Sequence, residues 1–187
     1  MIRVLMSGAG KMGITLLDGF EADTSTEPVG AVRAVGAVDK FAQGTGLTLT
    51  SGATIPLFND AVAAIDATKP DVVVDFTNAA WTPVLVDAAI DRGVRLVIGT
   101  TGLSQEWADD LLRRCAEKKV GGVLAANFAL GAVLMMHMAK IAAPFFESAE
   151  IIELHHAQKV DAPSGTSIAT ARGMLEARDG RPFGRNE

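Results

Sequence analysis

Residues 153–166 form the segment of this sequence that is richest in groups able to do chemistry. Two adjacent imidazoles, His155 and His156, are followed by the ammonium group of Lys159, and the segment ends in a Ser-Gly-Thr turn. Cationic side chains and the free N–H groups at the start of a helix both bind anions. We therefore expect this segment to bind a carboxylate.

Other interpretations of these residues are weaker. Neighbouring side chains on a strand point to opposite faces, so His155 and His156 are poorly placed to share a metal ion, and only His137 remains as a third histidine. Ser164 lacks the Gly-x-Ser-x-Gly elbow of a serine nucleophile. A polar loop capped by Pro163 and Ser164 would leave two histidines and a lysine unexplained. We expect no metal site, and we interpret His137 as a hydrogen-bonded core residue of an apolar helix.

A glycine-rich turn follows the first apolar run of the chain. The turn lies between a predicted strand and a predicted helix and has the pattern Gly-x-Gly-x-x-Gly. In that context glycines allow a tight turn and close approach of the backbone to a pyrophosphate, which binds the N–H groups of the helix N-terminus. We expect this turn to bind a dinucleotide; it consists of Gly8, Ala9, Gly10, Lys11, Met12 and Gly13.

The residue that follows the second strand bears on the choice of dinucleotide. An acidic residue there accepts the ribose hydroxyls, usually ~20 residues after the glycine turn. Asp39 occupies this position, somewhat later than usual. Lys40 beside it could instead meet a 2′-phosphate, so NADH and NADPH both remain open.

Three further loops follow later strands. Ligands of open α/β sheets bind at the carboxyl ends of the strands. The loops at 75–77 and 99–102 are small and carry hydroxyl groups, so they can approach a ribose or a nicotinamide closely, although each alone is also typical of an ordinary turn. The loop at 125–128 adds an amide and an aromatic ring to the same rim.

The elements that must position these residues alternate between strand and helix. Short continuous runs of Val, Ile and Leu are typical of strands buried on both faces, and their alternation with helices indicates right-handed βαβ units. We predict an α/β fold with a Rossmann-type, doubly wound parallel sheet over residues 1–126. The predicted strands are 2–7, 29–38, 71–76, 94–98 and 120–125, and the predicted helices are 11–20, 58–67, 81–92 and 104–118, with Ser104 as N-cap of the last and a connection over 44–55.

The pattern changes after residue 126. A nearly all-apolar helix is predicted over 129–143, a strand over 150–155 and a helix over 164–178. One strand and two helices cannot complete a sheet of their own. We therefore predict that 127–187 is the beginning of an α+β substrate-binding and oligomerisation domain, incomplete at its C-terminus.

Composition excludes several classes of protein. The 187 residues allow one full domain and the beginning of a second. A net charge of −5 argues against a nucleic-acid surface, which needs a clustered basic face. Cys115 is the single cysteine, so a disulfide framework and a Cys-x-x-Cys pair are excluded, as expected for a cytoplasmic protein.

One stretch of the chain could alternatively be a membrane-spanning helix. Residues 120–139 carry no charged side chain and as one helix would be long enough to span a bilayer. Asn127, His137 and three glycines interrupt this stretch. We favour a strand, a turn and a buried helix. The apolar run at 1–6 is too short for a signal peptide.

Taken together, these motifs resemble the dihydrodipicolinate reductase family, also called 4-hydroxy-tetrahydrodipicolinate reductase, of diaminopimelate and lysine biosynthesis. The resemblance covers essentially the whole chain and is weakest over 44–56. Its most specific part is the run His-His-x-x-Lys-x-Asp-Ala-Pro-Ser-Gly-Thr. The other matching motifs are 10–13, 74–77, 99–102 and 126–128.

The resemblance implies reduction of a cyclic imine dicarboxylate by NADH or NADPH. It implies that His155 is the general acid/base and that Lys159 donates the proton or pairs with a substrate carboxylate. The substrate would be held by His156, Lys159, Gly165, Thr166 and Thr101. The cofactor would be lined by the glycine turn and by Asp39, Lys40, Phe76, Gly99, Thr100, Thr101, Ala126, Asn127 and Phe128. A homotetramer is implied for a full-length member.

Two departures from the family pattern stand out. Ser7 occupies the position of the first family glycine, a change that Gly8 can absorb. Family members also continue beyond the position of Glu187, which implies a C-terminally incomplete form here. The alternatives are another nicotinamide-dependent reductase of a small dicarboxylate, or an inactive dinucleotide-binding module.

Overall fold

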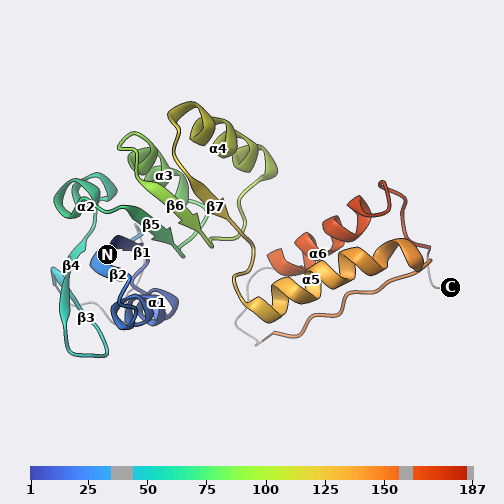
Figure 1. Cartoon of the computed structure of the whole chain (residues 1–187), viewed down its shortest axis with the longest axis horizontal. Helices are drawn as coiled ribbons and strands as arrows, with labels where there is room; N and C mark the ends of the chain where they lie inside the picture. The colour runs from blue at the N-terminus through green and yellow to red at the C-terminus, as the bar shows by residue number, and fades with distance from the viewer. Residues whose placement is uncertain (35–43, 156–161, 185–187) are drawn as a thin grey trace. The chain divides into compact units, whose positions relative to one another are not determined.

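The computed structural model describes residues 1–34, 44–155 and 162–184. The chain divides into two compact units, Met1–Leu124 and Ala125–Glu187 (Figure 1). Within the described residues, no helix combines the length and the apolar character needed to cross a membrane.

The first unit is built on a seven-stranded sheet with the order β3-β4-β2-β1-β5-β6-β7. All neighbouring strands pair in parallel except β3 and β4, which are antiparallel. The predicted α/β fold with a doubly wound, mainly parallel sheet is confirmed. The strands are β1 Ile2–Ser7, β2 Thr26–Val32, β3 Gly46–Thr48, β4 Thr54–Phe58, β5 Val72–Asp75, β6 Arg95–Ile98 and β7 Gly122–Leu124.

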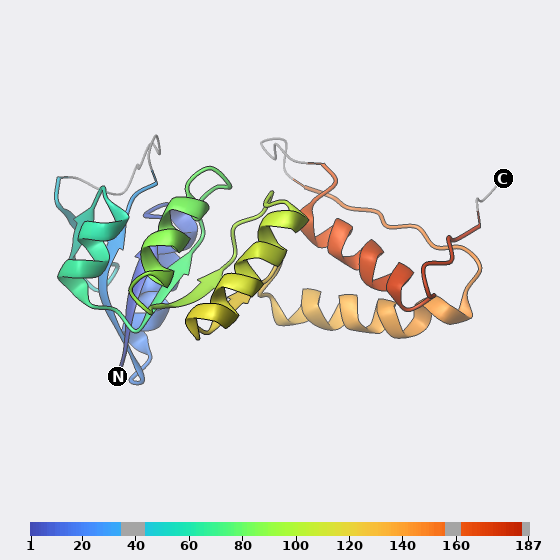
Figure 2. The ribbon, with the colours of Figure 1, turned by 90° about the horizontal axis from the view of Figure 1, so that it is seen from above.

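Helices cover both faces of this sheet (Figures 1 and 2). Alternate strand residues point to opposite faces: Leu5 and Val73 lie in the core beneath α2, α3 and α4, whereas Met6 and Val74 lie in the core beneath α1. This explains the continuous apolar runs in the sequence. The helices are α1 Lys11–Ala22, α2 Ala61–Thr68, α3 Thr82–Ile90 and α4 Gln105–Lys118.

The switch in strand order places the functional edge of the first unit. From β1 the chain proceeds outward to β2 and β4, and then returns to β5 on the other side of β1. The last residues of β1 and β5, Ser7 and Asp75, are paired neighbours. Loops that follow β1 and β5 therefore begin side by side, at the position where open α/β sheets bind ligands.

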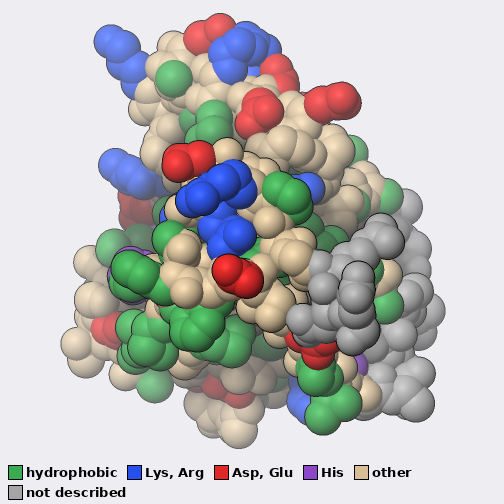
Figure 3. Space-filling view, turned by 90° about the vertical axis from the view of Figure 1, so that its right-hand side faces the viewer, with side chains coloured by type: hydrophobic (Ala, Val, Ile, Leu, Met, Phe, Trp, Pro, Cys, Tyr) green, Lys and Arg blue, Asp and Glu red, His purple; other side chains and the backbone are tan. Residues whose placement is uncertain are grey.

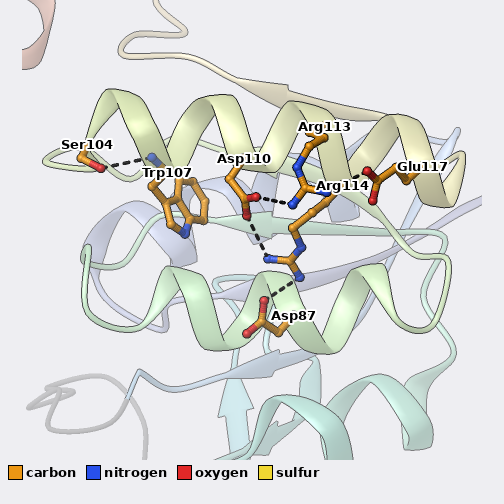
Figure 4. A network of polar contacts seen from close by, with 7 residues as sticks. All are labelled: Asp87, Ser104, Trp107, Asp110, Arg113, Arg114 and Glu117. Atoms are coloured by element: carbon orange, nitrogen blue, oxygen red, sulfur yellow. Dashed lines mark hydrogen bonds and ion pairs between the residues drawn. The ribbon is translucent and has the colours of Figure 1, made fainter.

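Helix α4 shows how capping and ion pairs fix an element at the predicted place. The Ser104 hydroxyl accepts a hydrogen bond from the Trp107 amide at 3.1 Å, which confirms the predicted N-cap (Figure 4). Arg114 pairs with Asp110 on its own helix and with Asp87 on α3, the latter at 2.7 Å. The two helices are thus linked across their exposed side.

The segment 44–55, expected to be a connection, instead contributes an antiparallel strand pair. Leu47 and Leu49 are buried there, and Leu47 pairs with Ile55 across β3 and β4. The predicted helix start at Phe58 was also wrong, because β4 runs to that residue. The helix begins only after Asp60, whose carboxylate accepts a hydrogen bond from the Ala63 amide at 2.7 Å.

The second unit consists of α5 Leu130–Ala142, a short 3₁₀ turn Ala143–Phe145, and α6 Gly165–Glu176. The two helices pack against each other and are joined by the pair Lys140–Glu176 at 3.0 Å. Figure 3 shows hydrophobic side chains grouped at the protein surface. Those exposed on α5 include Leu130, Met138 and Ile141.

Two expectations about this unit were wrong. Helix α5 has no buried residue, and His137 is exposed rather than a core residue, because nothing among the described residues of this unit covers that face. Residues 150–155 carry no strand, since a strand needs a hydrogen-bonded partner and the described part of the unit offers none.

Candidate active site

The glycine turn after β1 is tightly closed on itself. Gly8 has a φ of +106°, and a Cβ atom there would lie 2.8 Å from the Phe76 carbonyl oxygen. A Cβ atom at Gly13 would lie 1.8 Å from the Gly8 carbonyl oxygen. A side chain is therefore excluded at Gly8 by the positive φ and by the close contact, and at Gly13 by the close contact alone.

The start of α1 has the donor set of a phosphate site. Its N-cap is Gly10, which has no side chain to cap the helix. Within the described residues, the amides of Lys11, Met12 and Gly13 have no hydrogen-bond acceptor. A Cβ atom at Gly10 would meet nothing within 4 Å, so the space in front of this turn is open. These groups fit a pyrophosphate.

The buried carboxylate of Asp75 organises the loops after β5 and β6. Its Oδ1 accepts a hydrogen bond from the Thr77 hydroxyl at 2.7 Å. Its Oδ2 accepts hydrogen bonds from the hydroxyls of Thr82 at 2.6 Å and Thr100 at 2.8 Å. The Thr100 hydroxyl also accepts from the Thr77 amide at 2.9 Å. Asp75, Thr82 and Thr100 are all buried, so this network fixes both loops against α3.

Phe76 and Ser7 complete the rim. The Phe76 ring lies against the backbone of Gly99, where a Cβ atom would be 2.3 Å from the ring. Ser7 is fully buried, and its hydroxyl accepts a hydrogen bond from the indole N–H of Trp81 at 3.1 Å. Ser7 therefore links the end of β1 to the residue that precedes α3.

The structure thus brings most of the predicted dinucleotide residues of the first unit to one edge. The glycine turn, Phe76, Gly99 and Thr100 belong to adjoining loops, and Thr101 follows them with an exposed side chain. Asp39 and Lys40 lie outside the described residues. Sequence reasoning missed Thr82, because only the fold places it against Asp75.

In the second unit, Asn127 links the loop before α5 to the start of α6. Its side-chain amide donates to the Thr166 hydroxyl at 3.1 Å, and its side-chain oxygen accepts from the Ala129 amide at 2.8 Å. The neighbours Ala126 and Phe128 are exposed. A residue predicted near the cofactor therefore contacts one predicted to bind substrate.

The first turn of α6 is the second place where the sequence predicts an anion site. Ser164 is its N-cap, and the Ser164 hydroxyl accepts a hydrogen bond from the Ser167 amide at 3.2 Å. The Ser164 amide donates to the carboxylate of Glu153 at 3.0 Å. Among the described residues, the amides of Gly165 and Thr166 have no acceptor, so they remain available to a ligand.

A pocket of about 450 Å³ adjoins this turn. Its lining includes Asn127, Glu153, His155 and Thr166. His155 is exposed and so accessible to a ligand. His156 and Lys159 lie outside the described residues.

Glu153 is the first residue of the segment 153–166, and the sequence alone assigns it no role. Hydrogen bonding to Ser164, and then to Ser167, lowers the pKa of this carboxyl to about 2. The nearby His155 makes a smaller contribution to this lowering, and desolvation of the carboxyl opposes it. The sequence offers no local pattern for this contact, since Glu153 and Ser164 are 11 residues apart along the chain. Within the described part of the chain, no group of three or more His, Cys, Asp and Glu side chains could hold a metal ion.

Comparison with known sequences identifies two family matches. The family described as "Dihydrodipicolinate reductase, N-terminus" matches residues 2–128, and "Dihydrodipicolinate reductase, C-terminus" matches 131–186. The 4-hydroxy-tetrahydrodipicolinate reductase of Moorella thermoacetica is 44% identical over 97% of this chain and 67% of its own length. That of Dehalococcoides mccartyi (strain BAV1) is 43% identical over 95% of this chain and 66% of its own length. The chain thus spans about two thirds of the length of these relatives.

Solved structures agree. A dipicolinate-bound dihydrodipicolinate reductase from Paenisporosarcina sp. TG-14 superimposes with a TM-score of 0.78 at 35% identity, over 99% of this chain and 69% of that one. An amine dehydrogenase from Mycobacterium smegmatis has a TM-score of 0.57 at 19% identity, over 79% of this chain and 45% of that one, and shares only the fold. The resemblance expected from the motifs is confirmed: the chain belongs to the dihydrodipicolinate reductase family of NAD(P)H-dependent oxidoreductases in lysine and diaminopimelate biosynthesis.

Proposed function

We propose that this chain takes part in the reduction of 4-hydroxy-tetrahydrodipicolinate, or its dehydrated form, to tetrahydrodipicolinate. The observation that carries the proposal is the first turn of α6, where the amides of Gly165 and Thr166 are left without acceptors beside the pocket that His155 lines. Such a turn binds a carboxylate. The dipicolinate bound to the Paenisporosarcina relative is a dicarboxylate of this kind.

The division of labour follows the two units. We assign cofactor binding to residues 1–126, through Gly8–Gly13, Phe76 and Gly99–Thr101, and substrate binding to residues 127–187. Asp39, Lys40, Ala126, Asn127 and Phe128 belong to the cofactor assignment as well. The bare amides of α1 support it, because they supply donors without a competing side-chain cap.

NADH and NADPH are both proposed as cofactors. When bound, the reduced nicotinamide supplies a hydride. The motif leaves Asp39 to accept the ribose hydroxyls of NADH and Lys40 to meet the 2′-phosphate of NADPH. Titration of the wild-type chain with NADH and with NADPH measures its preference, and equal affinities would support the use of both. In Asp39→Ala, binding of NADH should weaken more than binding of NADPH.

The proton needed at the substrate nitrogen comes, in this proposal, from His155 or Lys159. Addition of a hydride to the carbon–carbon double bond conjugated with the imine shifts an electron pair onto nitrogen, and a nearby acid neutralises the charge. Because His155 lines the pocket beside the α6 amides, a carboxylate held there would lie near this imidazole. His156, Thr101 and Lys159 complete the proposed set for the dicarboxylate.

A variant of Lys159 tests the proton-donor role. We expect Lys159→Ala to lower turnover by about 10²-fold or more, the contribution typical of general acid catalysis, while cofactor affinity stays unchanged. Lys118→Ala, an exposed lysine on α4, is the matched control. An equal loss of turnover and of cofactor affinity in Lys159→Ala would contradict the role.

Substrate identity is tested by steady-state assay. We expect oxidation of NADH or NADPH with the cyclic imine dicarboxylate and not with pyruvate or oxaloacetate. Activity with another small dicarboxylate alone would favour a different reductase. Cofactor binding with no turnover and no binding of pyridine-2,6-dicarboxylate would favour an inactive dinucleotide-binding module.

Location and assembly belong to the proposal as well. A cytoplasmic location is supported by the single cysteine and by the reduced dinucleotide that the reaction consumes. A homotetramer is proposed for the full-length family member, supported by the exposed hydrophobic side chains of α5. Light scattering of this chain gives the state that it reaches by itself.

A further inference from the structure

Glu153 connects the two ends of the segment that holds the His-His-x-x-Lys motif. Its carboxylate oxygens lie 3.0 and 3.1 Å from the amide nitrogen of Ser164, and Oε2 lies 2.5 Å from the hydroxyl of Ser167. His155 follows two residues after Glu153, whereas Ser164 begins α6. A single side chain therefore holds the start of the motif against the first turn of the helix.

The hydrogen bonds of that turn leave a specific pair of donors. The Ser164 amide is taken by Glu153, and the Ser167 amide is taken by the Ser164 hydroxyl. Within the described residues the amides between them, those of Gly165 and Thr166, lack an acceptor. The Thr166 side chain is fixed in turn by Asn127. Glu153 and Ser164 thus decide which amides of α6 remain for a ligand.

We propose that Glu153 is a positioning residue of the substrate site, which does not touch the substrate but holds the α6 turn so that Gly165 and Thr166 present their amides together to one carboxylate. The role deepens the proposed function and rests on it for the identity of the ligand.

The negative charge of Glu153 favours this arrangement. An ionised carboxylate only accepts hydrogen bonds, and it faces two donors here, the Ser164 amide and the Ser167 hydroxyl. A glutamine at this position would place N–H groups against one of these donors. A negative charge beside a helix N-terminus is also favourable to the helix.

The test compares Glu153→Gln with Glu176→Gln, which removes a carboxylate from the other end of the same helix. Calorimetric titration with pyridine-2,6-dicarboxylate and fluorescence titration with NADH are performed on each. We expect Glu153→Gln to bind the dicarboxylate about tenfold more weakly, as for loss of a charge-assisted hydrogen bond, with NADH affinity unchanged. Ser167→Ala, which keeps the carboxylate, should give a smaller loss, and Glu176→Gln none.

Amide hydrogen exchange provides a readout that needs no ligand. In Glu153→Gln the hydrogen-bonded amides of Ser164 and Ser167 should exchange about tenfold faster than in the wild type, because the contact that holds the turn is lost, while the last turn of α6 is unchanged. In Glu176→Gln the amides of the last turn of α6 should exchange faster, because the contact with Lys140 is lost, and the amides of Ser164 and Ser167 should exchange as in the wild type.

The outcomes separate this role from the proposed function. If exchange at Ser164 and Ser167 rises but the wild type binds no dicarboxylate, Glu153 positions the turn and the proposed substrate is wrong. If exchange is unchanged, or if the variant loses dicarboxylate and NADH affinity equally, the positioning role is refuted.

Discussion

Two glycines of α1 differ in what a side chain would meet. A Cβ atom at Gly13 would lie 1.8 Å from the Gly8 carbonyl oxygen, whereas one at Gly19 would meet nothing within 4 Å. We expect Gly13→Ala to lower the free energy of unfolding by about 1–3 kcal/mol, as for an overpacked site, and to abolish dinucleotide binding. Urea denaturation and NADH fluorescence measure the two effects.

Gly19→Ala is the matched control in the same helix. Alanine favours the helix over glycine, so the free energy of unfolding should rise by about 0.4–1 kcal/mol with dinucleotide binding intact. Equal stability of the two variants would show that the close approach of Gly13 to Gly8 is not required.

The Asp75 network makes a second prediction. Thr82→Val keeps the side-chain shape but removes a buried hydroxyl that lies 2.6 Å from the Asp75 carboxylate. We expect the free energy of unfolding to fall by about 1.5–3 kcal/mol, the range for a hydrogen bond to a charged group. Thr48→Val, an exposed threonine on β3, should change it by less than ~0.5 kcal/mol. Equal effects in a denaturant titration would contradict the network's role.

These residues also show how far the sequence alone could go. A glycine turn between a strand and a helix predicts a dinucleotide loop because the spacing itself implies the geometry. Asp75 could be placed at a strand end but not given its partners, since Thr82 and Thr100 come from other elements. Glu153 escaped assignment for the same reason: its partners Ser164 and Ser167 lie on the following helix.

At the scale of elements, Glu153 makes the stability of the start of α6 dependent on pH. Its pKa is about 2 in the folded unit against an ordinary value of 4.5. A lowered pKa stabilises the fold above 4.5, and this contribution is lost as the pH falls from there through about 2. Circular dichroism should therefore show a larger loss of thermal stability between neutral pH and about pH 3 for the wild type than for Glu153→Gln. Parallel losses in the two proteins would rule out this contribution.

The cap of α4 gives an independent prediction. Ser104 accepts a hydrogen bond from the Trp107 amide, and its removal leaves that donor without its cap. We expect Ser104→Ala to lower the free energy of unfolding by about 1 kcal/mol. Ser104→Asp, which keeps an acceptor, should restore it in the same denaturant titration. A failure of aspartate to rescue stability would show that capping is not the cause.

The features that could not be predicted from the sequence were missed for physical reasons. The strands β3 and β4 lie in a Gly- and Thr-rich stretch whose short apolar pattern could not be told from a loop, although Leu47 and Leu49 are buried there. Helix α5 was expected to be buried because it is apolar. An apolar helix is stabilised by packing against other residues, but its sequence does not show which residues these are. Among the described residues of the second unit, none provides that cover.

At the scale of the whole molecule, the two units carry different halves of one proposed reaction. Unit 1 supplies the bare amides of α1 and the rim ordered by Asp75, and unit 2 supplies the α6 amides and His155. The proposed donors to the anionic ligands are local, namely backbone amides at two helix starts together with Lys159, so the mild net negative charge of the chain does not decide binding. Because the two proposed sites belong to different units, binding of the dinucleotide and binding of the dicarboxylate can be measured separately.

Fluorescence titration of this chain with NADH and with NADPH tests the central claim most directly. We expect saturable binding of at least one of them, with Gly13→Ala removing it and Gly19→Ala leaving it unchanged. Absence of saturable binding by either dinucleotide to the folded wild-type chain would contradict the claim that this is a nicotinamide-dependent reductase.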